Sequence, residues 1–112
     1  MGSRQLLIPY TDPGIPLARA VRAGVHEFSD SEGTAPRVIY LANHGLFVLA
    51  TSPSEALQIT EMANKNATIL LGTLAAGGPN FLSPDHLRRI DSRPDELYRR
   101  GKLATDGRGS DG

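Results

Sequence analysis

The chain has 112 residues, no cysteine, and twelve lysines and arginines balanced by twelve aspartates and glutamates, which gives a formal net charge of zero. This length allows one domain, or part of one, with a modest hydrophobic core. The neutral balance argues against a general nucleic-acid or membrane-surface binder, and the missing cysteines exclude disulfides, thiolate zinc sites, iron–sulfur clusters and a cysteine nucleophile.

The first third of the chain predicts a strand followed by a helix. Residues 5–9, Gln-Leu-Leu-Ile-Pro, form a compact apolar run that stops at a proline, which is typical of a short strand. Residues 10–14 predict a turn, because proline and glycine supply its dihedral angles. Pro16 suits the first turn of a helix, and apolar residues then recur at three- and four-residue spacing to about Phe28: Leu17, Ala20, Val21, Val25 and Phe28.

The middle of the chain predicts two strands joined by a tight turn. Residues 37–42, Arg-Val-Ile-Tyr-Leu-Ala, are almost continuously apolar, which favours a strand covered on both faces. An Asn-His-Gly tripeptide follows, and residues 46–50 predict the next strand. Two or three strands make a narrow sheet with exposed edges, so the sequence resembles part of a larger sheet.

A long helix is predicted to begin after Ser52. This serine can cap the helix, Pro53 takes the first helical position, and Glu55 stands three residues after the cap, as in a capping box. One apolar stripe then continues for about five turns, until the pair Gly77 and Gly78 ends the helix: Ala56, Thr60, Ala63, Ala67, Leu70, Leu71 and Leu74.

The C-terminal part predicts two short helices, over residues 83–90 and 93–100, and then a tail. Acidic residues offset most of the arginines here, so a solvated, salt-bridged face is favoured over a phosphate or RNA site. Residues 101–112 have almost nothing to bury and predict a disordered tail. The order of elements predicts an α/β fold with helices flanking a small sheet.

His44, in the Asn-His-Gly tripeptide, is the residue that most requires a chemical explanation. Histidine is tolerated in turns, where it often only hydrogen-bonds to backbone, and this interpretation is favoured by the residues alone. The alternative is a ligand aimed into a site. Asn43 and Gly45 are interpreted as the turn that positions this imidazole, and Tyr10 is a candidate pocket residue.

Two segments together resemble the C-terminal half of the class II aldolase/adducin family, and within it the L-fuculose-phosphate-type sugar-phosphate aldolases. They are IPYTDPGIPLARAV, residues 8–21, and VIYLANHGLFVLATSPSEALQITEMANKNATILL, residues 38–71. The resemblance covers roughly residues 6–75 and continues more weakly to about residue 92. It implies a partial three-layer α/β/α sheet, with residues 1–100 as the C-terminal portion of the family's domain.

The resemblance also implies a role for His44 as one of three imidazoles that hold a divalent metal, usually zinc. The family's other two metal histidines form a His-x-His pair, which lies upstream of the matching segments together with the catalytic glutamate and the phosphate-binding turns. His26 and His86 do not match ligand positions, and Glu61 is interpreted as a helix-face residue. The metal site is therefore expected to be incomplete, with no catalytic residue assigned, and whether the chain is an enzyme stays open.

Three functions are compatible with these features. The first is a metal-ligand-bearing half of a zinc-dependent sugar-phosphate aldolase or epimerase, inactive without the missing N-terminal half. The second is a non-catalytic, adducin-like module for interaction or oligomerisation, and the third is a truncated fragment. The expected partners are further copies of the chain or a complementing N-terminal half, and a sugar-phosphate substrate, but neither nucleic acid nor a membrane. Without a signal pattern or a spanning segment, the expected location is the cytoplasm.

Overall fold

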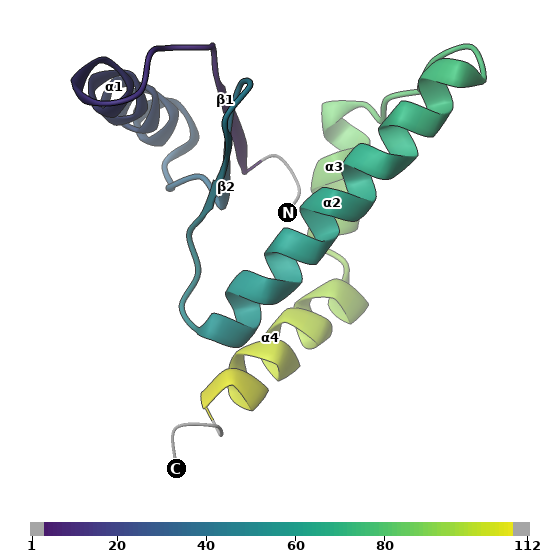
Figure 1. Ribbon diagram of the computed structural model, residues 1–112. Helices are drawn as coiled ribbons and strands as arrows, with labels where there is room; N and C mark the ends of the chain where they lie inside the picture. The colour runs from purple at the N-terminus through teal and green to yellow at the C-terminus, as the bar shows by residue number, and fades with distance from the viewer. Residues whose placement is uncertain (1–3, 109–112) are drawn as a thin grey trace. The chain divides into compact units, whose positions relative to one another are not determined.

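The computed structural model describes residues 4–108 (Figure 1). The chain divides into two compact units, with the boundary between Leu49 and Ala50. The first unit contains three strands and one helix, and the second contains three helices. No helix within the described range is both long and apolar enough to cross a bilayer.

The first unit is built on a three-stranded mixed sheet. Strands β1 (Gln5–Ile8), β2 (Val38–Leu41) and β3 (Gly45–Val48) lie in the order β1-β2-β3. β1 pairs in parallel with β2, with Gln5 opposite Val38 and Ile8 opposite Leu41. β2 pairs in antiparallel fashion with β3, with Leu41 opposite Gly45. The predicted α/β fold with a small sheet is therefore confirmed.

Helix α1 (Ile15–Glu32) forms the crossover that parallel pairing of β1 and β2 requires. It begins after Gly14, which has a φ of 99°, a value that glycine adopts without steric penalty because it lacks a side chain. The helix ends at Gly33, which has the left-handed conformation. The helix is about one turn longer than the periodicity predicted. Its apolar stripe covers one face of the sheet, where the core contains Leu6, Ile8, Leu17, Ala20, Val21, Val25, Ile39 and Leu41.

The central strand is buried on both of its faces, as its continuous apolar sequence predicted. Val38 and Ile39 point to opposite faces because side chains alternate along a strand, and both are almost fully buried. On β1, by contrast, Ile8 is buried against α1 whereas Leu7, which points to the opposite face, is exposed.

α1 and β1 approach each other most closely at Gly24. A Cβ atom at this position would lie 2.5 Å from Ile8 Cδ1, well inside van der Waals contact. Ile8 is itself buried against α1, so its terminal methyl group would have to leave this contact to admit a side chain at Gly24. The missing side chain of Gly24 therefore sets how near the helix can lie to the strand.

This contact predicts opposite effects for two helical glycines. Gly24→Ala should destabilise the chain by about 1 kcal/mol, because the cost of overpacking against Ile8 exceeds the gain in helix propensity. Gly72→Ala is the matched control in the second unit, since a Cβ there would meet nothing within 4 Å. It should raise the stability of its unit by about 0.5–1 kcal/mol. Urea unfolding followed by circular dichroism measures both, and equal effects would contradict the packing argument.

The second unit contains α2 (Pro53–Ala75), α3 (Pro84–Asp91) and α4 (Pro94–Arg108), and both α2 and α3 contact α4. The predicted cap of α2 is present. The Glu55 backbone N donates to Ser52 Oγ at 3.1 Å, and Glu55 Oε2 accepts from the Thr51 backbone N and hydroxyl, both at 2.7 Å. Gly77 and Gly78 follow the helix with positive φ angles, as its predicted end requires.

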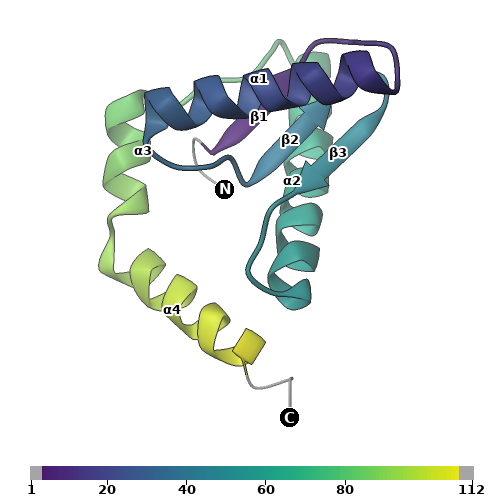
Figure 2. The same cartoon turned by 90° about the vertical axis from the view of Figure 1, so that its left-hand side faces the viewer.

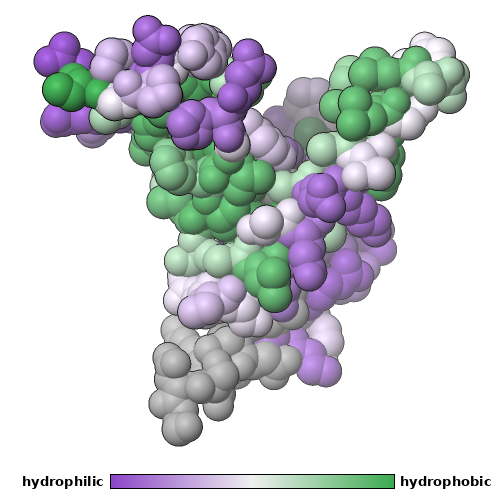
Figure 3. Space-filling view, viewed as in Figure 1, coloured by the Kyte–Doolittle hydropathy of each residue, from purple (hydrophilic) through white to green (hydrophobic). Residues whose placement is uncertain are grey.

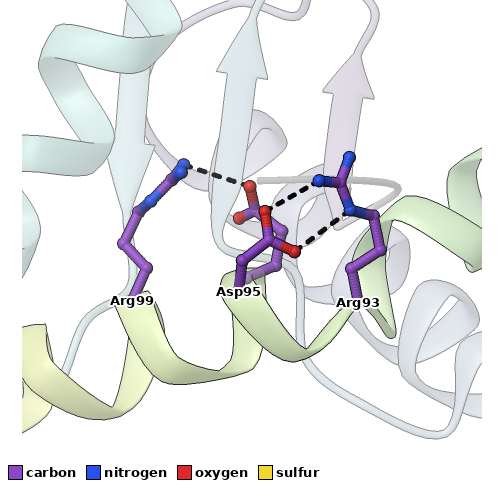
Figure 4. Close-up of polar contacts among 4 residues, drawn as sticks. Arg93, Asp95 and Arg99 are labelled. Atoms are coloured by element: carbon purple, nitrogen blue, oxygen red, sulfur yellow. Dashed lines mark hydrogen bonds and ion pairs between the residues drawn. The ribbon is translucent and has the colours of Figure 1, made fainter.

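Exposed ion pairs line α3 and the start of α4. Arg93 makes a two-bond pair with Asp95, at 3.0 and 2.9 Å, and Arg99 reaches Glu96 at 3.0 Å (Figure 4). A further pair joins Arg88 to Asp85 in α3. The predicted salt-bridged face is confirmed by these pairs, each of which contributes little to stability because water screens it.

The predicted disordered tail, residues 101–112, overlaps the last helix. α4 continues through Arg108, whereas residues 109–112 lie outside the described range. A helix already started by Pro94 and the acidic residues Asp95 and Glu96 can add residues at one hydrogen bond each. The prediction of a tail was based on the lack of apolar residues to bury, and that criterion does not detect a helix that is extended by backbone hydrogen bonds.

The α2 cap generates a second stability prediction. Ser52→Ala should destabilise the helix by about 1 kcal/mol, because the N–H of Glu55 loses its acceptor. Ser54→Ala is a matched control at a neighbouring exposed position inside the helix, and it should have almost no effect. Thermal unfolding of the two variants separates them, and a Ser54 effect as large as that of Ser52 would count against the cap.

Candidate functional site

Parallel pairing brings two loops of the first unit to the same edge of the sheet. β1 and β2 end side by side, and the Ala42 backbone N donates to the Ile8 carbonyl at 3.1 Å just beyond the last strand pair. The β1–α1 loop, residues 9–14, and the β2–β3 turn, residues 42–44, therefore share one end of the sheet, as both views show (Figures 1 and 2). Ligands of α/β sheets commonly bind at such carboxyl ends.

The β2–β3 connection is a tight turn with Asn43 in the left-handed region. The His44 backbone N donates to the Leu41 carbonyl at 3.0 Å, and Asn43 has a φ of 58°. Asn43 is the one non-glycine residue with positive φ within the described range, and it is the third residue of the turn from Leu41 to His44. Asparagine tolerates this conformation better than most residues do.

The turn presents the His44 side chain to solvent. His44 is exposed, and no group among residues 4–108 hydrogen-bonds to its ring. Gly45 follows as the first residue of β3, without a positive φ and with space around its α-carbon. In this structure Asn43 supplies the unusual turn dihedral angle, and Gly45 begins the ladder with β2.

The β1–α1 loop places oxygen atoms at the same end of the sheet. Tyr10 is 57% exposed, and its hydroxyl donates to Asp12 Oδ1 at 3.4 Å. The Thr11 hydroxyl donates to the Pro9 carbonyl at 3.1 Å. Tyr10 is the pocket residue predicted from the sequence, whereas Thr11 and Asp12 were not predicted, although polar residues directly after an apolar strand are a signal for this edge.

The residues of the described range do not by themselves fit a catalytic zinc site. Such a site takes three protein ligands and an open position, whereas no group of three histidine, cysteine, aspartate or glutamate side chains within this range could hold a metal ion. His26 lies in α1, and His86 lies in the first turn of α3, where its backbone N donates to Ser83 Oγ at 3.2 Å. Glu61 is exposed on α2.

Comparison with models of protein families gives a match. The family model described as the class II aldolase and adducin N-terminal domain matches residues 1–71, which is well over half of the chain. The chain belongs to the class II aldolase/adducin family. The match includes the whole sheet, α1 and most of α2, so this class II aldolase/adducin domain contains the Asn-His-Gly turn. No curated protein and no solved structure matched the chain.

The turn yields a prediction that needs no ligand. Asn43→Gly should leave stability nearly unchanged, because glycine adopts positive φ readily. Asn43→Val should cost about 1–2 kcal/mol, since a β-branched residue is strained in the left-handed region. Chemical denaturation checks the difference, with Asn64→Val on an exposed, helical part of α2 as a control for loss of the amide. Equal stability of the two Asn43 variants would contradict the turn assignment.

Proposed function

We propose that His44 is one ligand of a divalent metal ion in a class II aldolase-type centre, whose remaining ligands come from outside the described residues. The observation that carries this proposal is the exposed imidazole at the carboxyl end of β2, on a turn held by the left-handed Asn43. The family typically uses a metal ion, and zinc is the proposed ion. Neutral imidazole is a common ligand for it.

The proposed substrate is a sugar phosphate or a related short hydroxy-carbonyl compound, cleaved or epimerised next to its carbonyl group. The chain's own contribution is placement. The hydrogen bond from His44 N to Leu41 O and the left-handed Asn43 fix the backbone that carries the ring. Tyr10 and Asp12, at the same end of the sheet, supply a hydroxyl and a carboxylate that can contact substrate hydroxyls. No proton-transfer step is assigned to these residues.

The test measures the metal content of the tagged chain, purified from cells together with any polypeptide bound to it. Zinc, manganese, iron and cobalt are measured per chain by mass spectrometry. We expect about one divalent ion per chain in the unmodified protein, and at least a tenfold loss in His44→Ala because a ligand is missing. His86→Ala is the matched control, and its metal content should not change. Cleavage of a ketose phosphate by the same samples should follow the metal content.

Full metal retention by His44→Ala would overturn this proposal. Equal metal loss from the His44 and His86 variants would do the same, because it would indicate loose binding to exposed histidines. Circular dichroism of each variant confirms that the fold is intact, so that metal loss is not a consequence of unfolding.

A second candidate, a non-catalytic adducin-like interaction module, is favoured by the exposed apolar side chains of β3 and its end. Leu46, Phe47 and Leu49 are 39%, 51% and 46% exposed, and apolar surface is visible beside α1 where the strands lie (Figure 3). Exposed apolar patches of this kind commonly mark protein interfaces. A metal-free oligomer that is unaffected by His44→Ala would favour this second function.

A further inference from the structure

β1 is an edge strand with one side open. Its even-numbered residues bond to β2: the Arg4 carbonyl accepts from Val38 N at 3.3 Å, and the Ile8 carbonyl accepts from Ala42 N at 3.1 Å. Backbone direction alternates along a strand, so the N–H and C=O of Leu7 point away from β2. Charged side chains usually protect such an edge against added strands, and residues 5–9 carry none.

A groove of about 460 Å³ runs along this open side. β1 and Pro9 form one wall, and α1, which crosses the sheet and extends past β1, forms the other (Figure 2). Small side chains on the helix leave the space for the groove, and its lining residues from α1 are Ala20, Ala23, Gly24, Glu27, Phe28 and Ser31. The helix therefore overhangs the position that a further strand, about 4.8 Å from β1, would occupy.

Glu27 gives the groove a negative charge. It is the one ionisable residue in the lining, and it forms no ion pair with any residue in the described part of the chain. An open backbone edge selects an extended polypeptide, the apolar lining selects apolar side chains on alternate positions, and Glu27 selects a cation.

We propose that an extended segment of another polypeptide adds to β1 as a fourth strand, with apolar side chains beneath α1 and a lysine or arginine beside Glu27. A second copy of the chain fits less well. Residues 5–9 offer no cation, and the nearest one, Arg4, donates from Nε to the Ala35 carbonyl at 3.0 Å. Pairing of β3 from one copy with β1 of the next would be head-to-tail. It would leave one β1 edge and one β3 edge of the pair open, so that further copies could add without limit.

The probe is a blocked peptide of alternating valine and threonine with a lysine at each end, added to the full chain. We expect backbone amide shifts in NMR spectra at Leu6, Leu7 and Ile8 and on the groove side of α1, with slower hydrogen exchange of the Leu7 amide. The control is the same peptide with N-methyl groups on alternate residues, which removes its strand hydrogen bonds. It should bind at least tenfold more weakly.

Two pairs of variants locate the binding. Ala23→Leu fills the groove from an exposed helix position and should abolish binding, whereas Ala18→Leu, also exposed on α1 but outside the groove, should not. Glu27→Gln should weaken binding a few-fold and reduce its salt dependence, whereas Asp30→Gln, outside the lining, should not.

Equal binding by the N-methylated peptide, unchanged binding by Ala23→Leu, or amide shifts centred on β3 would each overturn the proposal. Dimerisation of the chain alone that is lost in Ala23→Leu would also overturn it, because the occupant would then be a second copy. None of these outcomes depends on metal, so failure of the metal-ligand role of His44 leaves this inference standing.

Discussion

The first unit depends on the parallel pairing of β1 with β2. Parallel neighbours cannot be joined by a tight turn, so the chain must return across the sheet, and α1 makes that return. The helix needs an apolar stripe to cover the strands and a close approach at Gly24 to reach them. The same pairing places the ends of both strands together, which unites the loop after Ile8 with the turn that carries His44.

The narrow sheet also explains why the described part of this class II aldolase/adducin domain has open strand edges. Three strands leave two edges, and their backbone polar groups retain hydrogen-bonding capacity on the outer side. On β1 the overhang of α1 converts the open edge into an apolar groove with a single carboxylate. On β3 the side chains of Leu46 and Phe47 remain exposed instead. One edge therefore borders an apolar groove, and the other presents an apolar patch.

The candidate site combines a rigid backbone with a single imidazole. A left-handed asparagine and one backbone hydrogen bond are enough to set the direction of the turn, because a three-residue connection between paired strands has few other conformations. A metal centre of the proposed kind requires several donors around one ion. Placement of His44 at an exposed strand end is compatible with donors that arrive from a different polypeptide segment, and the open edge of β1 is a second place where such a segment can be held.

Local signals in the sequence determined the elements themselves. Pro9 and Pro53 marked a strand end and a helix start, Ser52 with Glu55 formed the predicted cap, and the apolar run around Val38 became a strand buried on both faces. Each of these depends on groups within a few residues, so each can be read from a short window. The Asn-His-Gly bend is a local signal of the same kind, and its positive φ belongs to Asn43.

Tertiary structure alone decided which segments meet. That β1 pairs in parallel with β2, that Tyr10 and Asp12 therefore share an edge with His44, and that α1 overhangs a groove beside Leu7 depend on contacts between residues more than a dozen positions apart. The close contact of Gly24 with Ile8 belongs to the same group. Periodicity specifies which face of an element is apolar, but many partners satisfy that requirement equally, and only the packed chain selects one.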